Sequence, residues 1–240
     1  MLAAVSQEHT SGGIETIWQI CANLQKMGYP VVVLDGSAPE TPHTPGLQHL
    51  LQQAPWRDEG GLDLGVIASS LAVIPAFHGL QQLAQLAQTA PQPPLERLLP
   101  YFRAYGLLVL HASADLLGEL LTHTHTAPLV VMDSNPAGVL KSYQSCKQIA
   151  LTAGLSCLVA ARIDGQGAGP LHRAQVALET LEQCADRHLG GHIKTTTIQA
   201  SQAQDLQRLA LQFLENAGSI GASMTSTPWA STMGHSVRSH

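Results

Sequence analysis

Continuous runs of apolar residues alternate with amphipathic segments from one end of the chain to the other. A run of β-branched and aliphatic residues without polar alternation is typical of a strand buried on both faces of a parallel sheet. Runs of this kind occupy residues 2–6, 31–35, 71–75, 107–111, 129–133, 157–163 and 193–198. They predict an α/β fold with a doubly wound, mostly parallel sheet of about seven strands, helices on both faces, and strands 2–6 and 107–111 in the middle.

The segments between these runs have the spacing of helices. They cover residues 14–27, 47–53, 80–88, 95–103, 114–122, 138–153, 171–187 and 203–216. Strand and helix alternate as in right-handed βαβ units. The 240 residues are enough for one large core, so we expect one domain over residues 1–218 and a disordered tail over residues 219–240, which are mostly small and polar.

Charge is scarce in this chain. Only 12% of the residues are charged, about half the usual share, and the net charge is −5. Twelve scattered basic residues do not form a nucleic-acid footprint, and no stretch is apolar enough to span a membrane. We therefore expect no nucleic-acid partner, no integral membrane segment and a cytoplasmic location. The four cysteines form no CxxC pair, and Cys21, Cys146 and Cys157 are expected to be buried thiols.

The first strand runs into a glycine-containing loop that opens a helix. The loop reads Glu8, His9, Thr10, Ser11, Gly12, Gly13, Ile14. A strand, such a loop, a helix and a second strand ending in Asp35 are the parts of a phosphate-binding unit. The alternative is an ordinary strand-to-helix turn, in which the glycines serve only the backbone geometry.

This unit resembles the start of a MinD/ParA-type P-loop ATPase, which carries the motif KGGxGKT. Without gaps, Glu8 lies at the signature Lys, Gly13 at the P-loop Lys and Ile14 at the Mg²⁺-binding Thr. If the register is shifted by two residues, Thr16 falls at the Mg²⁺-binding position, but Glu15 then falls at the position of the P-loop Lys. No register restores a Lys, because none precedes Lys26. The resemblance implies a P-loop NTPase-like fold with a degenerate nucleotide loop.

The resemblance extends to about residue 216. Residues 71–84 are similar to the segment GLxVIPGxxGLxxLA of the MinD-like flagellar-number regulators. His111 stands where the family has the Walker B Asp that orients Mg²⁺, and Arg162 replaces the Asn that reads adenine. Pro136 and Tyr143 match the family. The resemblance thus implies a pseudo-ATPase that keeps the scaffold and has lost the chemistry.

Two functional hypotheses follow. In the first, the chain is a regulatory or scaffolding protein, with no cofactor expected. Its partner would be a flagellar placement GTPase, a switch component or a secretion-system subunit, cellulose secretion being the runner-up system. A homodimer and recruitment to the cell pole or inner membrane by a partner stay open. In the second, the chain is an active or nucleotide-gated ATPase with a rearranged loop, and weak ATP or ADP binding stays open.

Three other sets of residues carry weaker functional signals. His123 and His125 share a face only on a strand and have no third ligand nearby, so a polar loop is favoured over a metal site. Asp133 and Asp164 end two strands and line a ligand site or simply face solvent. Trp229, in the tail, is interpreted as an incidental aromatic.

Overall fold

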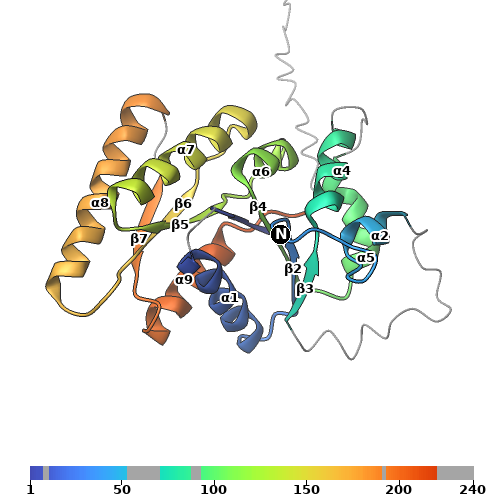
Figure 1. Cartoon of the computed structure of the whole chain (residues 1–240), viewed down its shortest axis with the longest axis horizontal. Helices are drawn as coiled ribbons and strands as arrows, with labels where there is room; N and C mark the ends of the chain where they lie inside the picture. Colours follow the sequence, from blue (N-terminus) through green and yellow to red (C-terminus); the bar gives the residue numbers. More distant parts are fainter. Residues whose placement is uncertain (8–10, 53–70, 88–92, 191–192, 221–240) are drawn as a thin grey trace, which may run out of the picture.

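The computed structural model describes residues 1–7, 11–52, 71–87, 93–190 and 193–220. Its centre is a seven-stranded sheet with the order β3-β2-β4-β1-β5-β6-β7 (Figure 1). All six pairs of neighbouring strands are parallel. The strands are β1 (Leu2–Val5), β2 (Val31–Asp35), β3 (Ala72–Pro75), β4 (Leu107–Ala112), β5 (Leu129–Asp133), β6 (Leu158–Arg162) and β7 (Lys194–Ile198). The predicted parallel sheet, with β1 and β4 in its middle, is confirmed.

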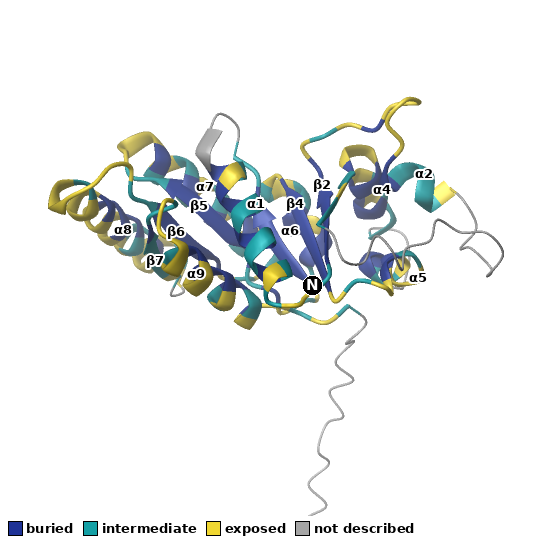
Figure 2. Ribbon diagram, turned by 90° about the horizontal axis from the view of Figure 1, so that it is seen from below, coloured by how far each residue is buried: buried dark blue, intermediate teal, exposed yellow. Residues whose placement is uncertain are grey.

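Helices cover both faces of this sheet (Figures 1 and 2). One face is covered by α1 and α9, which pack against each other. The other face is covered by the remaining helical elements. Their bounds are α1 (Ser11–Lys26), α2 (Leu47–Gln52), α4 (Phe77–Ala87), η1 (Pro94–Leu98), α5 (Leu99–Phe102), α6 (Ala114–Leu121), α7 (Pro136–Ala153), α8 (Ala168–His188) and α9 (Ala203–Glu215).

The strands are apolar throughout because successive side chains enter two different cores. In β1, Ala3 and Val5 belong to the core under α4 to α8, while Leu2 and Ala4 belong to the core under α1 and α9. Each of these four residues is buried. Burial on both faces removes the polar alternation that a half-exposed strand would show.

Helix starts differ most from the sequence-based expectation. Helix α1 begins at Ser11 and α4 at Phe77, each three residues earlier than predicted. The predicted starts followed the first apolar position of each periodic pattern. The predicted helix 95–103 is two short elements, η1 and α5, with Pro100 in the first turn of α5. A proline is tolerated there but cannot continue a preceding helix.

The ends of the domain meet. The terminal ammonium of Met1 donates to the carbonyl oxygen of Gly218 at 2.6 Å, and the Gly218 amide donates back to Met1 at 2.9 Å. Residues 221–240, including Trp229, lie outside the described residues, so the disordered tail stays a prediction. None of the helices in the described ranges is long and apolar enough to cross a bilayer.

The three cysteines that were predicted to be buried are buried. Burial raises the pKa of the Cys21 thiol to about 12, so this group stays protonated.

Candidate functional site

The site is built where β2 and β4 end side by side. Asp35 and His111 are opposite each other in the parallel ladder, so their side chains emerge at the same point of the sheet's C-terminal edge. Asp35 Oδ1 lies 3.0 Å from His111 Nδ1. Because an ionised carboxylate only accepts hydrogen bonds, the proton of this contact is on Nδ1. Two of the predicted site residues are therefore direct partners.

The Asp35 carboxylate is further held by the loop that follows it. Its Oδ1 accepts from the Ser37 amide at 3.0 Å and from Ser37 Oγ at 2.6 Å. Burial by itself favours the neutral acid, but the hydrogen bonds from His111 and Ser37 outweigh it and hold the pKa of Asp35 below its usual value. The pair is thus a charge-assisted link between two strands.

Helix α1 lies over this pair. The Trp18 ring centroid is 6.2 Å from that of His111. The His111 side chain is only 2% exposed, and Thr16, two residues before Trp18 in α1, is buried as well. The imidazole is therefore enclosed between the sheet edge and α1.

A second group of charges lies at the ends of β5 and β6. Arg162 Nη2 lies 2.6 Å from Asp164 Oδ1, and Nη1 lies 3.7 Å from Asp133 Oδ1. The Ser134 hydroxyl donates to the Arg162 carbonyl. The guanidinium is thus shared by two carboxylates of its own chain: Asp133 ends β5, whereas Asp164 lies two residues beyond the end of β6.

Glu40 is a site residue that the sequence analysis missed. Its carboxylate is buried and accepts backbone N–H groups of His78 (2.8 Å), Gly79 (2.9 Å) and Gln48 (3.1 Å). These groups are unpaired donors in the first turns of α4 and α2. Burial opposes its ionisation, yet these hydrogen bonds hold the pKa of Glu40 below its usual value. Glu40 precedes His78 by 38 residues, so no sequence signal next to α4 marks this capping interaction.

The nucleotide loop is described only in part. Glu8, His9 and Thr10 lie outside the described residues. Ser11, Gly12, Gly13 and Ile14 form the first turn of α1, in which Gly13 is buried and Ile14 half-buried.

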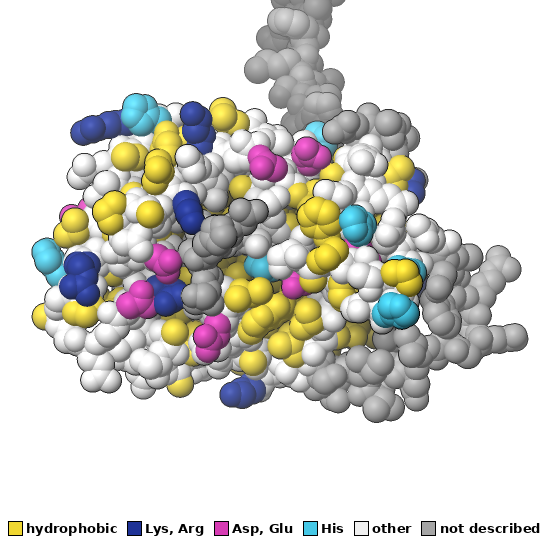
Figure 3. Space-filling view, viewed as in Figure 1, with side chains coloured by type: hydrophobic (Ala, Val, Ile, Leu, Met, Phe, Trp, Pro, Cys, Tyr) yellow, Lys and Arg dark blue, Asp and Glu magenta, His cyan; other side chains and the backbone are white. Residues whose placement is uncertain are grey.

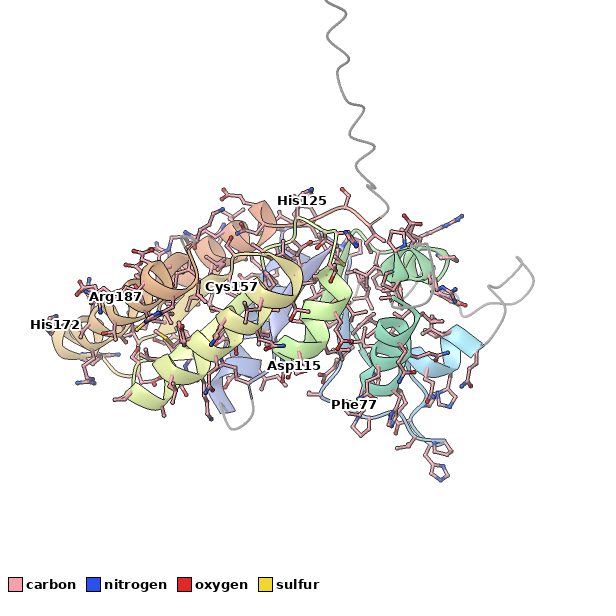
Figure 4. All side chains as sticks on the ribbon, turned by 90° about the horizontal axis from the view of Figure 1, so that it is seen from above. Phe77, Asp115, His125, Cys157, His172 and Arg187 are labelled. Atoms are coloured by element: carbon pink, nitrogen blue, oxygen red, sulfur yellow. The ribbon has the colours of Figure 1, made fainter. Side chains whose placement is uncertain are left out.

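A cavity of about 690 Å³ opens at the same sheet edge. Its floor is formed by residues that follow β1, β2 and β4, namely Ser6, Gly36, Ser37 and Ser113. Its walls are α4 and α6. Phe77 and Asp115, labelled in Figure 4, come from the first turns of these two helices and lie on the same side of the molecule.

The resemblance places His111 and Arg162 at the metal-orienting and adenine-reading positions, and carboxylates of this chain hold both side chains. The imidazole of His111 binds Asp35 in place of a metal-orienting carboxylate, and the Arg162 guanidinium is occupied by two aspartates. Within the described ranges, no three His, Cys, Asp or Glu side chains are grouped to hold a metal ion. His123 and His125 are exposed in the loop between α6 and β5, as predicted for a polar loop.

Comparison with known proteins identifies the architecture. No family model matches the sequence, and no curated protein matches it. Among solved structures, apo McdA from Cyanthece is 16% identical over 88% of this chain and 89% of its own, with a TM-score of 0.56. The ParA of pNOB8 bound to nonspecific DNA is 12% identical over 89% and 97%, with a TM-score of 0.54. A chain of the MinC:MinD cell division protein complex from Aquifex aeolicus is 10% identical over 91% of this chain and 97% of its own, with a TM-score of 0.50.

Proposed function

We propose that this chain, which has the fold of the MinD/ParA-type P-loop ATPases, is a regulatory binding protein without ATP hydrolysis. The observation that supports the proposal best is the buried contact between Asp35 and His111. In the resembling ATPases the position of His111 carries the carboxylate that orients Mg²⁺. Here a neutral or cationic imidazole holds the neighbouring carboxylate directly, so the link between β2 and β4 needs no metal.

The chemistry of phosphoryl transfer supports the same conclusion. In such reactions the protein contributes mainly positioning and positive charge around the phosphates. The chain has no Lys or Arg before Lys26, and the Arg162 guanidinium is shared by Asp133 and Asp164. Because its positive charge is already balanced by two carboxylates, the Arg162 guanidinium would stabilise the charge of a triphosphate only weakly.

The competing function is an ATPase that uses a rearranged loop. Isothermal titration with Mg-ATP and with ADP, combined with a phosphate-release assay, separates the two. We expect no turnover and weak or absent binding. Micromolar Mg-ATP affinity with Mg²⁺-dependent turnover would overturn the proposal.

We further propose that the partner belongs to flagellar placement or to a related surface-structure or secretion system. The motivation is the resemblance of residues 71–84 to the flagellar-number regulators. These residues form β3 and most of α4, which walls the cavity. A flagellar placement GTPase, a switch component or a secretion subunit would be captured with the tagged protein from its own organism. Deletion that leaves flagellar number and cellulose export unchanged would rule out both systems.

We further propose that the chain has no nucleic-acid partner. We also propose that it is cytoplasmic and reaches the cell pole or inner membrane through its protein partner. The net charge is −5, and Lys and Arg side chains are scattered over the face seen in Figure 3. Gel-shift titration with nonspecific DNA at low salt tests the first point, because phosphate contacts are strongest there. Fluorescence localisation with and without the partner tests the second.

A further inference from the structure

The cavity at the sheet edge continues as a groove between two neighbouring helices. One wall is the face of α4 that carries Phe77, Gln81, Ala84 and Gln85. The opposite wall is the face of α6 that carries Asp115, Leu116 and Glu119. From Phe77 to Gln85 the helix rises about 12 Å, which is the length of a short peptide segment.

The charges of this groove have one sign. Among the lining residues in the described part of the chain, Asp115 and Glu119 are the charged ones, and both are exposed. Neither carboxylate forms an ion pair with another residue in the described part of the chain. In Figure 3, the acidic side chains over α6 have no Lys or Arg beside them. The groove therefore attracts cations.

An anion is disfavoured at the same place, although two helices begin there. Helix N-termini ordinarily attract anions through their free N–H groups. At α4, the amides of His78 and Gly79 are already bound by Glu40. At α6, the Leu116 amide donates to Ser113 Oγ and Asp115 adds a negative charge to the first turn. The groove is thus not a second phosphate site.

Phe77 adds a preference among cations. Phe77 is 36% exposed and lines the α4 wall of the groove, while Asp115 lines the α6 wall. A guanidinium stacks on an aromatic face and pairs with a carboxylate at the same time, which an ammonium does less well. An arginine between Phe77 and Asp115 would satisfy both.

We propose that the α4–α6 groove binds an extended, arginine-bearing segment of a protein partner. Asp115 and Glu119 are one helical turn apart, about 6 Å along the axis of α6. Alternate residues of an extended segment are separated by about 7 Å, so two arginines at positions i and i+2 reach both carboxylates. A helix is too wide to enter between α4 and α6, which contact each other. This inference deepens the proposed role as a binding protein, but it does not depend on whether the chain binds ATP.

The test uses the full chain and a blocked peptide, acetyl-Ser-Arg-Ser-Arg-Ser-amide. Binding is followed by ¹H–¹⁵N chemical-shift titration at low salt and at about pH 8, where ordinary histidines are neutral. We expect saturable binding with shifts concentrated on α4 and α6. The variant D115N/E119Q should bind the peptide with an affinity lower by roughly fivefold or more, because it loses two exposed ion pairs. Phe77→Ala should reduce binding of this peptide more than that of its lysine counterpart.

The matched control is E179Q/E215Q. It also removes two exposed carboxylates, from α8 and α9, and should change the affinity by less than about twofold. Thermal unfolding of every variant shows whether the fold is retained. Equal weakening in both double variants would mean attraction by net charge alone and would overturn the proposal. Equal affinity for a peptide with glutamate in place of arginine would also overturn it. The same holds if spermidine binds as tightly as the arginine peptide and is weakened equally by D115N/E119Q. ATP titration of the same samples tests the proposed lack of nucleotide binding separately from peptide binding. The failure of either proposal can therefore be recognised by itself.

Discussion

Asp35 Oδ1 and His111 Nδ1 are 3.0 Å apart across two neighbouring parallel strands, and both side chains are largely withdrawn from water. A buried carboxylate is costly unless it is paired. His111 supplies that pairing from within the chain. The contact therefore links the ends of β2 and β4, and its contribution to stability can be measured.

Replacing His111 with Asp should destabilise the fold. Two carboxylates would face each other in a buried site, and we expect a loss of about 2–4 kcal/mol in the free energy of unfolding. His111→Asn, which keeps a donor for Asp35, should lose about 1 kcal/mol. Urea denaturation with and without Mg²⁺ measures both. If H111D is as stable as the parent chain without Mg²⁺, the pair has no structural role.

Replacing Glu40 with Gln should weaken the packing of α2 and α4. The amide can present only one oxygen to three backbone donors, and its own NH₂ group would face them. We expect a loss of about 1–3 kcal/mol by urea denaturation, with E179Q as the exposed control near zero. An E40Q protein with unchanged stability would show that solvent replaces these hydrogen bonds.

Stability should fall in acid because Asp35 and Glu40 have lowered pKa values in the fold. Each carboxylate contributes stability that is fully present above its unfolded pKa, about 3.9 for Asp and 4.3 for Glu, and that is lost as pH falls through its folded value. Urea midpoints between about pH 6 and pH 2 should therefore decrease below about pH 4. E40Q should show a shallower decrease than the parent chain. Parallel pH profiles would mean that Glu40 does not titrate differently on folding.

Restoring the loop tests its ancestry. The variant E8K/G13K/I14T reintroduces both lysines and the Thr hydroxyl. Gly13 lies within α1, where Lys finds an ordinary backbone conformation. Because Gly13 is buried and Ile14 half-buried, we expect G13K and I14T to lower the free energy of unfolding by about 0.5–3 kcal/mol in total. ATP binding should appear in calorimetry. Hydrolysis should require the addition of H111D, which supplies the metal-orienting carboxylate.

The control for that experiment is E8K alone, which adds one cation without rebuilding the loop. A quadruple variant that folds but binds no nucleotide would show that the loop no longer forms a phosphate nest. The likeness to the ATPases would then be one of sheet topology, and the role as a binding protein would stand by itself.

The parallel sheet was predictable because its cause is local and repeated along the chain. A strand such as Val31–Asp35 is apolar at successive positions since both of its faces are buried, and no other common element has that pattern at that length. The absence of lysine before Lys26 and the presence of His111 at the end of its strand were also visible in the sequence.

The tertiary structure alone decided what those residues contact. Asp35 and His111 are 76 residues apart, and only the parallel register of β2 and β4 brings them to 3.0 Å. Glu40 reaches the first turn of α4 from 38 residues away, so no capping signal near that helix marks its start. The α4–α6 groove exists because α4 follows β3 and α6 follows β4, the two strands on either side of β2. Apolar periodicity determines which segments are buried, while long-range hydrogen bonds and helix packing determine which polar groups meet.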